Sequence, residues 1–171
     1  MNIKRIVVGP LDENCYILTK ENKTIIIDPG DEFVKIDKEI EGKLVGIIIT
    51  HHHFDHVGAL NELKNKYSIP IIDYQNQKTI EPFNYEIIET PGHTGDSVSI
   101  YFKEEEIMFC GDFIFKGTIG RTDLPTGNME EMKKSIKEIL KYDENLILYS
   151  GHFCSTTLKE EKENLKKLIK Y

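Results

Sequence analysis

The sequence predicts a mixed α/β (α+β) fold in which two sheets are covered by helices. Short segments rich in β-branched and aromatic residues recur along the chain, and helical patterns are interleaved with them. Ionisable residues follow several of the predicted strands. At 171 residues the chain is long enough to bury a substantial core without disulfides, so we expect one domain over residues 1–171.

The predicted strands are short and apolar. Several are followed closely by Gly, Asp or other turn-forming residues, which is typical of strand ends. They cover residues 3–8, 15–18, 24–27, 44–49, 69–73, 85–89, 97–102, 106–110 and 146–149.

Four helices are predicted from apolar residues at three- and four-residue spacing. Asn128 and Thr157 each precede a helical pattern, and a Glu three positions later would complete a capping box in both cases. The apolar faces are marked by Phe33, Ile36 and Ile40; by Leu60, Leu63 and Tyr67; by Met129, Met132, Ile136, Ile139 and Leu140; and by Leu158, Leu165, Leu168 and Ile169.

Charge and composition narrow the class of protein. The net charge of −7 argues against a nucleic-acid partner, which would require clustered basic residues. No segment reaches the length of a membrane span, and the N-terminal residues do not form a signal peptide. The three cysteines show no disulfide spacing, so we expect a cytoplasmic protein. Nothing in the sequence specifies an oligomeric state.

The run of residues 51–56 is the most informative motif. His51 and His53 follow an apolar strand, and because alternate side chains of extended chain point the same way, both can reach one cation while His52 points elsewhere. Asp55 and His56 can then serve a second cation. Imidazole and carboxylate are ligands that Zn²⁺, Fe and Mn accept, so the motif predicts half of a two-metal site.

Three further ionisable residues follow predicted strands. His93 lies in a Pro-Gly turn, Asp112 follows the strand at 106–110, and His152 follows the strand at 146–149. Each taken alone is also explained as a loop histidine or a turn-forming aspartate. Taken together they favour the metal site, because they leave only His52, among six histidines, without a metal role.

The motifs resemble the metallo-β-lactamase superfamily, in particular its glyoxalase II-like branch of small hydrolases. The resemblance covers nearly the whole chain, and the motifs occur in the family's order. They are residues 27–30, 50–56, 90–94, 111–112, 119–123 and 151–152. The predicted element order fits the family's four-layer αββα sandwich.

The resemblance implies a ligand set and two supporting residues. Asp28 would be an acceptor that steadies the metal loop, although a turn-forming role explains it equally well. A basic residue near Arg121 helps to hold glutathione in glyoxalase II, whereas an ion pair with Asp123 is the structural alternative. By resemblance, one metal is bound by His51, His53 and His93, the other by Asp55, His56 and His152, and Asp112 bridges the two.

The function implied is hydrolysis of thioesters such as hydroxyacyl-thiol conjugates, by a hydroxide shared between two divalent ions. Zn²⁺ is favoured, with Fe and Mn as alternatives. Asp55 and Asp112 would orient the hydroxide and take up its proton. The substrate would be a small molecule, with no nucleic-acid or membrane partner.

Other functions stay open. A persulfide dioxygenase would use a single iron held by His51, His93 and Asp112, which is a subset of the same ligands. Hydrolysis of lactones and a non-catalytic metal-binding module are further alternatives. A β-lactamase is disfavoured because some of these enzymes carry cysteine at the position of Asp112. A flavodiiron protein is disfavoured because it has glutamate at the position of His53.

Overall fold

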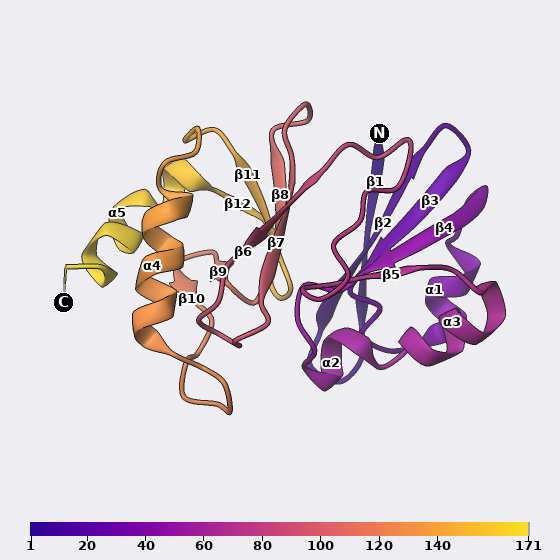
Figure 1. Ribbon diagram of the computed structural model, residues 1–171, viewed down its shortest axis with the longest axis horizontal. Helices are drawn as coiled ribbons and strands as arrows, with labels where there is room; N and C mark the ends of the chain where they lie inside the picture. The colour runs from indigo at the N-terminus through magenta and orange to yellow at the C-terminus, as the bar shows by residue number, and fades with distance from the viewer. Residues whose placement is uncertain (171) are drawn as a thin grey trace. The chain divides into compact units, whose positions relative to one another are not determined.

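The computed structural model describes residues 1–170, which form two compact units. The first unit is Met1–Asn84, and the second begins at Tyr85 (Figure 1). Each unit contains one five-stranded sheet and its own helices. The expectation of one domain over residues 1–171 stays a prediction.

The sheet of the first unit has the order β1-β2-β3-β4-β5. Its first three strands are antiparallel neighbours, whereas β3, β4 and β5 run parallel. The strands are β1 (Asn2–Val8), β2 (Glu13–Lys20), β3 (Lys23–Ile27), β4 (Lys43–Ile48) and β5 (Ile71–Ile72), and the helices are α1 (Phe33–Lys38), α2 (Phe54–Val57) and α3 (Leu60–Tyr67).

The core of the first unit lies between its sheet and helices α1 and α3. Ile36 of α1 and Leu63 of α3 are fully buried against strand residues such as Ile17, Ile26 and Ile47. Burial of a large aliphatic side chain stabilises the fold by roughly 1.5–3 kcal/mol. This packing fixes the edge at which β3 and β4 end.

The sheet of the second unit has the order β12-β11-β8-β7-β6, and β8 and β11 are parallel. A separate short hairpin, β9–β10, follows β8. The strands are β6 (Glu86–Glu89), β7 (Val98–Phe102), β8 (Ile107–Gly111), β9 (Ile114–Phe115), β10 (Thr118–Ile119), β11 (Ile147–Ser150) and β12 (Thr156–Thr157), and the helices are α4 (Met129–Ile139) and α5 (Leu158–Leu168).

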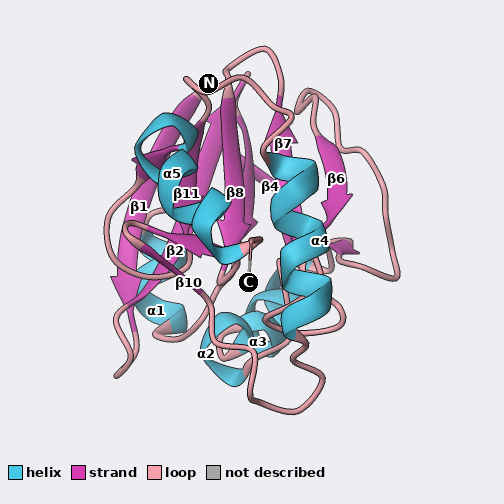
Figure 2. Cartoon of the chain, turned by 90° about the vertical axis from the view of Figure 1, so that its left-hand side faces the viewer, coloured by secondary structure: helices cyan, strands magenta, loops and turns pink. Residues whose placement is uncertain are grey.

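Helices α4 and α5 cover one face of the second sheet (Figure 2). Their buried residues, among them Met132, Ile136 and Leu165, pack against Met108 of β8 and Leu148 of β11. The methionines at helical spacing therefore include a core residue. Within residues 1–170, no helix combines the length and the apolar character that a membrane crossing requires.

Both predicted N-caps are present. The side chain of Asn128 accepts hydrogen bonds from the backbone N–H groups of Glu130 (2.9 Å) and Glu131 (3.2 Å). Thr157 Oγ1 accepts from Glu160 N at 3.2 Å. The carboxylate of Glu160 accepts from Thr156 Oγ1 at 2.8 Å, so this glutamate also ties the helix to β12.

Two details of the secondary structure differ from the prediction. The strand predicted at 69–73 is reduced to Ile71–Ile72, because Pro70 has no N–H to donate and the Asp73 carboxylate accepts from Gln75 N (3.0 Å) and Asn76 N (2.8 Å) to form a turn. The sequence patterns also miss α2, β9, β10 and β12. Each has only two to four residues, too few to display a period.

Candidate metal centre

The topology of the first unit brings two candidate loops to one sheet edge. Strands β3 and β4 are parallel neighbours, so the residues that follow them leave the sheet at the same edge. Asp28 follows β3, and Thr50 and His51 follow β4.

Asp28 connects these two loops. Its Oδ1 atom accepts a hydrogen bond from Thr50 N at 2.7 Å, and its Oδ2 atom accepts from Thr50 Oγ1 at 2.6 Å. The same Oδ2 atom lies 3.0 Å from Nδ1 of His56. The backbone of Asp28 has a positive φ of 51°, so it is also a turn residue. The two explanations that its position in the sequence allowed therefore both apply.

The histidines of the 51–56 motif converge locally. The Nε2 atom of His51 lies 3.2 Å from Nδ1 of His53, and the His51 and His56 ring centroids are 4.1 Å apart. His51 and His56 are buried. His52 lies on the other side of the extended segment, where its Nε2 atom is 3.6 Å from Asp73 Oδ2 and its side chain is 46% exposed. Asp55 Oδ2 is 4.0 Å from His56 Nε2.

Glu13 is a buried acidic residue that sequence reasoning missed. Its Oε1 atom lies 3.8 Å from Nδ1 of His56, and the residue is 1% exposed. Glu13, Asp28 and His56 each offer a ligand atom within 4.8 Å of the others. The position of Glu13 at the start of β2 gave no indication of its burial, because a glutamate beside a turn is ordinarily exposed.

The second unit gathers another group of ligands. Strands β8 and β11 are parallel neighbours, and Asp112 and His152 follow their ends. The Oδ2 atom of Asp112 lies 3.6 Å from Nε2 of His93 and also 3.6 Å from Nε2 of His152. One carboxylate oxygen thus lies equally close to two imidazole nitrogens.

The orientation of His93 is fixed by backbone. Its Nδ1 atom lies 2.7 Å from the carbonyl oxygen of Arg121, which can accept a hydrogen bond only from an Nδ1 atom that carries a hydrogen. Gly120 makes this approach possible, because a Cβ atom there would lie 1.8 Å from the Asp112 carbonyl oxygen and 3.1 Å from His93 Nδ1. Gly92 allows the same turn to pack closely on α4, because a Cβ atom there would lie 2.5 Å from Met132 Cα.

The side chain of Arg121 forms a bidentate pair with Asp123. Nε and Nη2 donate to the two carboxylate oxygens, each at 2.7 Å, and both side chains are exposed. The guanidinium lowers the pKa of Asp123 to about 2. This is the structural alternative noted above, and a substrate-binding role for Arg121 stays a prediction.

The three cysteines occupy different environments. Cys15 and Cys110 are buried, whereas Cys154 is exposed. Burial, followed by the charges of Glu13 and Asp28, raises the pKa of the Cys15 thiol well above its ordinary value. Cys154 therefore departs from the common behaviour of free cysteine as a small buried hydrophobe.

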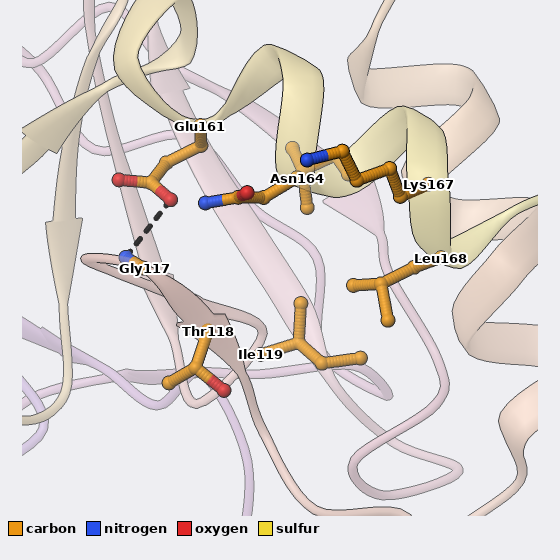
Figure 3. A pocket seen from close by; sticks show the side chains of 8 residues that line it. Gly117, Thr118, Ile119, Glu161, Asn164, Lys167 and Leu168 are labelled. Carbon is orange, nitrogen blue, oxygen red and sulfur yellow. Dashed lines mark hydrogen bonds between the residues drawn. The ribbon is translucent and has the colours of Figure 1, made fainter.

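A pocket of about 400 Å³ lies in the second unit between β10 and α5 (Figure 3). Glu161 lies at its wall, 3% exposed, where its Oε2 atom accepts from Gly117 N at 2.9 Å and its Oε1 atom accepts from Thr156 Oγ1 at 2.7 Å. The buried carboxylate thus links helix α5 to the β9–β10 hairpin. None of the predicted metal ligands lines this pocket.

Both groups of side chains fit a metal. Imidazole nitrogens and carboxylate oxygens are the donor types that divalent first-row metals accept. Asp28 orients His56 in the first group, and the Arg121 carbonyl orients His93 in the second. The fold and these side chains define a mixed α/β metal-binding protein.

The chain belongs to the metallo-β-lactamase superfamily, whose family model matches residues 8–82 and 73–152. A probable metallo-hydrolase of Bacillus subtilis, YqgX, is 35% identical, with 95% of each chain covered. The hydroxyacylglutathione hydrolase GloC of Haemophilus influenzae is 31% identical, with 96% of each covered. This membership supports a metal-dependent hydrolase.

Solved structures confirm the fold class. BLEG-1, a B3 metallo-β-lactamase, has a TM-score of 0.90 and is 29% identical, with 98% of this chain and 99% of that chain covered. TTHA1623 in a di-iron-bound form has a TM-score of 0.83 and is 27% identical, with 93% and 96% covered. The predicted α/β metallo-β-lactamase fold is therefore correct.

Proposed function

We propose that this protein is a binuclear metal-dependent hydrolase of thioesters, such as hydroxyacyl-thiol conjugates. The position of Asp112 Oδ2, 3.6 Å from Nε2 of both His93 and His152, carries this proposal. A carboxylate that serves two metals must lie close to ligands of both, and Asp112 does so within its own unit. The 31% identity to GloC supports the thioester as substrate class.

Seven side chains would hold two divalent ions. His51, His53 and His93 would bind the first ion, and Asp55, His56 and His152 the second, with Asp112 shared by both. Zn²⁺ is our first choice of metal, while the di-iron form of TTHA1623 supports iron as the alternative. When bound, two such ions supply Lewis acidity that polarises a carbonyl and lowers the pKa of water.

The protein's own residues would orient the ligands and move protons. The Asp28 carboxylate holds the Nδ1 side of His56, and the Arg121 carbonyl holds the Nδ1 side of His93. Nε2 of each ring would then be the atom offered to the ion. The carboxylates of Asp55 and Asp112 would accept the proton of the attacking water. The thiol carrier would then leave as thiolate.

A small soluble thioester is the substrate type we propose, encountered in the cytoplasm. The net charge of −7 does not favour nucleic acid or an anionic membrane surface. Hydrolysis of a β-lactam is a second candidate, because BLEG-1 is 29% identical over 98% of this chain.

The test is metal analysis followed by substrate comparison. Protein purified without added metal should contain close to two first-row metal ions per chain, and it should hydrolyse a 2-hydroxyacyl thioester under steady-state conditions. A single iron with persulfide-dependent O₂ consumption would instead identify a dioxygenase. Faster cleavage of a chromogenic cephalosporin than of every thioester would identify a β-lactamase. Either result would overturn the proposal.

A further inference from the structure

Exposed phenylalanines flank the candidate ligands. Of the eight phenylalanines in the chain, only Phe54 (71% exposed) and Phe153 (67% exposed) lie largely open to solvent; the other six are buried or half-buried. Phe54 stands between His53 and Asp55, and Phe153 directly follows His152. Single exposed apolar side chains are ordinary on protein surfaces. It is therefore the position of these two rings beside the candidate ligands, and not their exposure alone, that calls for an explanation.

The backbone at Phe153 is strained. Its φ is 65°, in the left-handed region that bulky residues rarely adopt. The Ser150 hydroxyl is hydrogen-bonded within this turn, at 2.8 Å from the carbonyl oxygen of His152 and 3.4 Å from that of Cys154. Glycine would adopt this conformation without strain. A phenylalanine here therefore needs a reason other than the turn itself.

The ring of Phe153 is also held in place. It packs edge-to-face on buried Phe115 at 5.7 Å between centroids, and its centroid lies 6.3 Å from that of His152. Phe115 in turn lies 6.1 Å from the His152 ring. One side of Phe153 is thus supported by protein, and the other faces solvent beside a candidate ligand.

Phe54 lies beside candidate ligands of the first unit. It is the first residue of α2, whose N-cap is His53. The chain just beyond α2 is held to the Asp28 loop by a hydrogen bond from Ala59 N to Pro29 O at 3.0 Å. This hydrogen bond helps to hold the short helix that carries Phe54 and the neighbouring ligands His53 and Asp55.

We propose that Phe54 and Phe153 are specificity-determining residues, each of which contacts an apolar group of the substrate beside the candidate ligands next to it in its own unit. This inference rests on the proposed thioesterase function. Both rings offer apolar area without charge or hydrogen-bond donors, so they would favour an alkyl or aryl group over a polar one. That group belongs either to the acyl part or to the thiol part of the substrate.

Two pairs of thioester substrates test whether the apolar group belongs to the acyl part or to the thiol part. In the acyl pair, hexanoyl and glycolyl groups are carried on N-acetylcysteamine. In the thiol pair, an acetyl group is carried on butanethiol or on 2-mercaptoethanol. We expect the Zn²⁺-loaded wild-type protein to favour the apolar member of at least one pair in kcat/KM, and Phe153→Ala or Phe54→Ala to reduce that preference about three- to tenfold.

The controls separate selectivity from stability. Val34→Ala removes an equally exposed apolar side chain (61%) from α1 and should leave the preference unchanged. Phe153→Gly relieves the backbone strain at residue 153. This variant should have a melting temperature close to that of the wild type but should lose the preference for the apolar substrate. Metal content should be unchanged in all four variants. An identical preference in the wild type, Phe54→Ala and Phe153→Ala would overturn the inference.

A binding measurement tests the apolar contact even if the protein is not a thioesterase. If the metal-loaded protein hydrolyses no thioester, saturation-transfer NMR compares the binding of hexanoate and of glycolate to the same variants. Weaker hexanoate binding in Phe153→Ala or Phe54→Ala, with glycolate unaffected, would support the apolar contact although the thioesterase proposal had failed. Equal hexanoate binding in all proteins would overturn the apolar contact as well.

Discussion

The Oδ2 atom of Asp28 lies 3.0 Å from the Nδ1 atom of His56, and both residues are almost completely buried. The residues are 28 positions apart in the sequence, yet one carboxylate orients the imidazole and also accepts two hydrogen bonds from Thr50. The loop after β3 thus fixes the loop after β4. A candidate ligand held in this way would need little reorganisation on metal binding.

Replacing this carboxylate should weaken metal binding. Asp28→Asn keeps the size of the side chain but supplies only one acceptor oxygen, so one donor of Thr50 or His56 loses its partner. We expect Zn²⁺ affinity, measured by competition with a chelator, to fall about 10- to 100-fold. Asp143→Asn removes an exposed carboxylate of the second unit and should change nothing. Wild-type affinity in Asp28→Asn would contradict the orienting role.

Loss of Asp112 should disturb both metals at once. Its Oδ2 atom is equidistant from His93 and His152, so Asp112→Ala should lower the metal content toward zero. His93→Ala and His152→Ala should each lower it by about one ion per chain, because each belongs to one coordination shell. Elemental analysis of dialysed protein measures this directly.

His52→Ala is the matched control for these ligand variants. His52 belongs to the same histidine run, but its side chain is 46% exposed and lies near Asp73. We expect it to keep the metal content of the parent protein. Equal metal content in Asp112→Ala and the parent protein would rule out the bridging assignment.

Much of the fold and of the candidate site could be predicted from the sequence. The strands at 3–8, 15–18, 24–27 and 44–49 match β1 to β4 within two residues, because each carries a continuous local apolar pattern. Most candidate ligands lie just after a strand, so the local patterns that locate the strands also indicate where these residues lie.

The features of the site that the sequence did not predict depend on contacts between distant segments. Glu13 is buried because β2 is covered along most of its length, which no local pattern reveals. The backbone carbonyl of Arg121 holds His93, and a carbonyl carries no sequence signal. Strands β9, β10 and β12 have two residues each, too few to display an alternating pattern.

The contact between α1 and α3 should make stability depend on pH. The Asp37 carboxylate accepts from Lys66 Nζ at 2.7 Å and from Tyr67 Oη at 2.6 Å, and these bonds lower the pKa of Asp37 below its ordinary value. A lowered folded-state pKa stabilises the protein above the unfolded pKa of about 4, and this contribution is lost as the pH falls through the folded pKa. Asp37→Asn should therefore destabilise at pH 7 and have less effect at pH 2–3.

The expected size of the Asp37 effect is small. Hydrogen bonds at a partly exposed carboxylate contribute about 0.5–1.5 kcal/mol, or roughly 2–5 °C in melting temperature for a chain of this size. Glu163→Gln is the control, because its pair with Lys166 is exposed and lies within α5. An Asp37→Asn protein with the wild-type melting temperature at pH 7 would refute the linkage.

The cysteines should differ in reactivity. Cys154 is exposed, whereas Cys15 is fully buried and its raised pKa keeps the thiol protonated at neutral pH. We expect iodoacetamide at pH 8 to modify one cysteine of the folded protein and all three after denaturation, as measured by mass spectrometry. Cys154→Ser should abolish the fast modification. Rapid labelling of Cys15 in the native state would show that the β2 region opens.

Arg121 should contribute little to recognition of the thiol carrier. Its guanidinium already donates two 2.7 Å hydrogen bonds to Asp123, so binding a carboxylate of glutathione would require exchange of one exposed ion pair for another. We therefore expect a glutathione thioester to be cleaved less than about tenfold better, in kcat/KM, than the same acyl group on N-acetylcysteamine. Arg121→Ala should change this ratio by less than about threefold, with Asp123→Asn as the matched control. Steady-state kinetics decide the matter, since a preference of about a thousandfold that Arg121→Ala abolishes would show that this arginine binds the carrier.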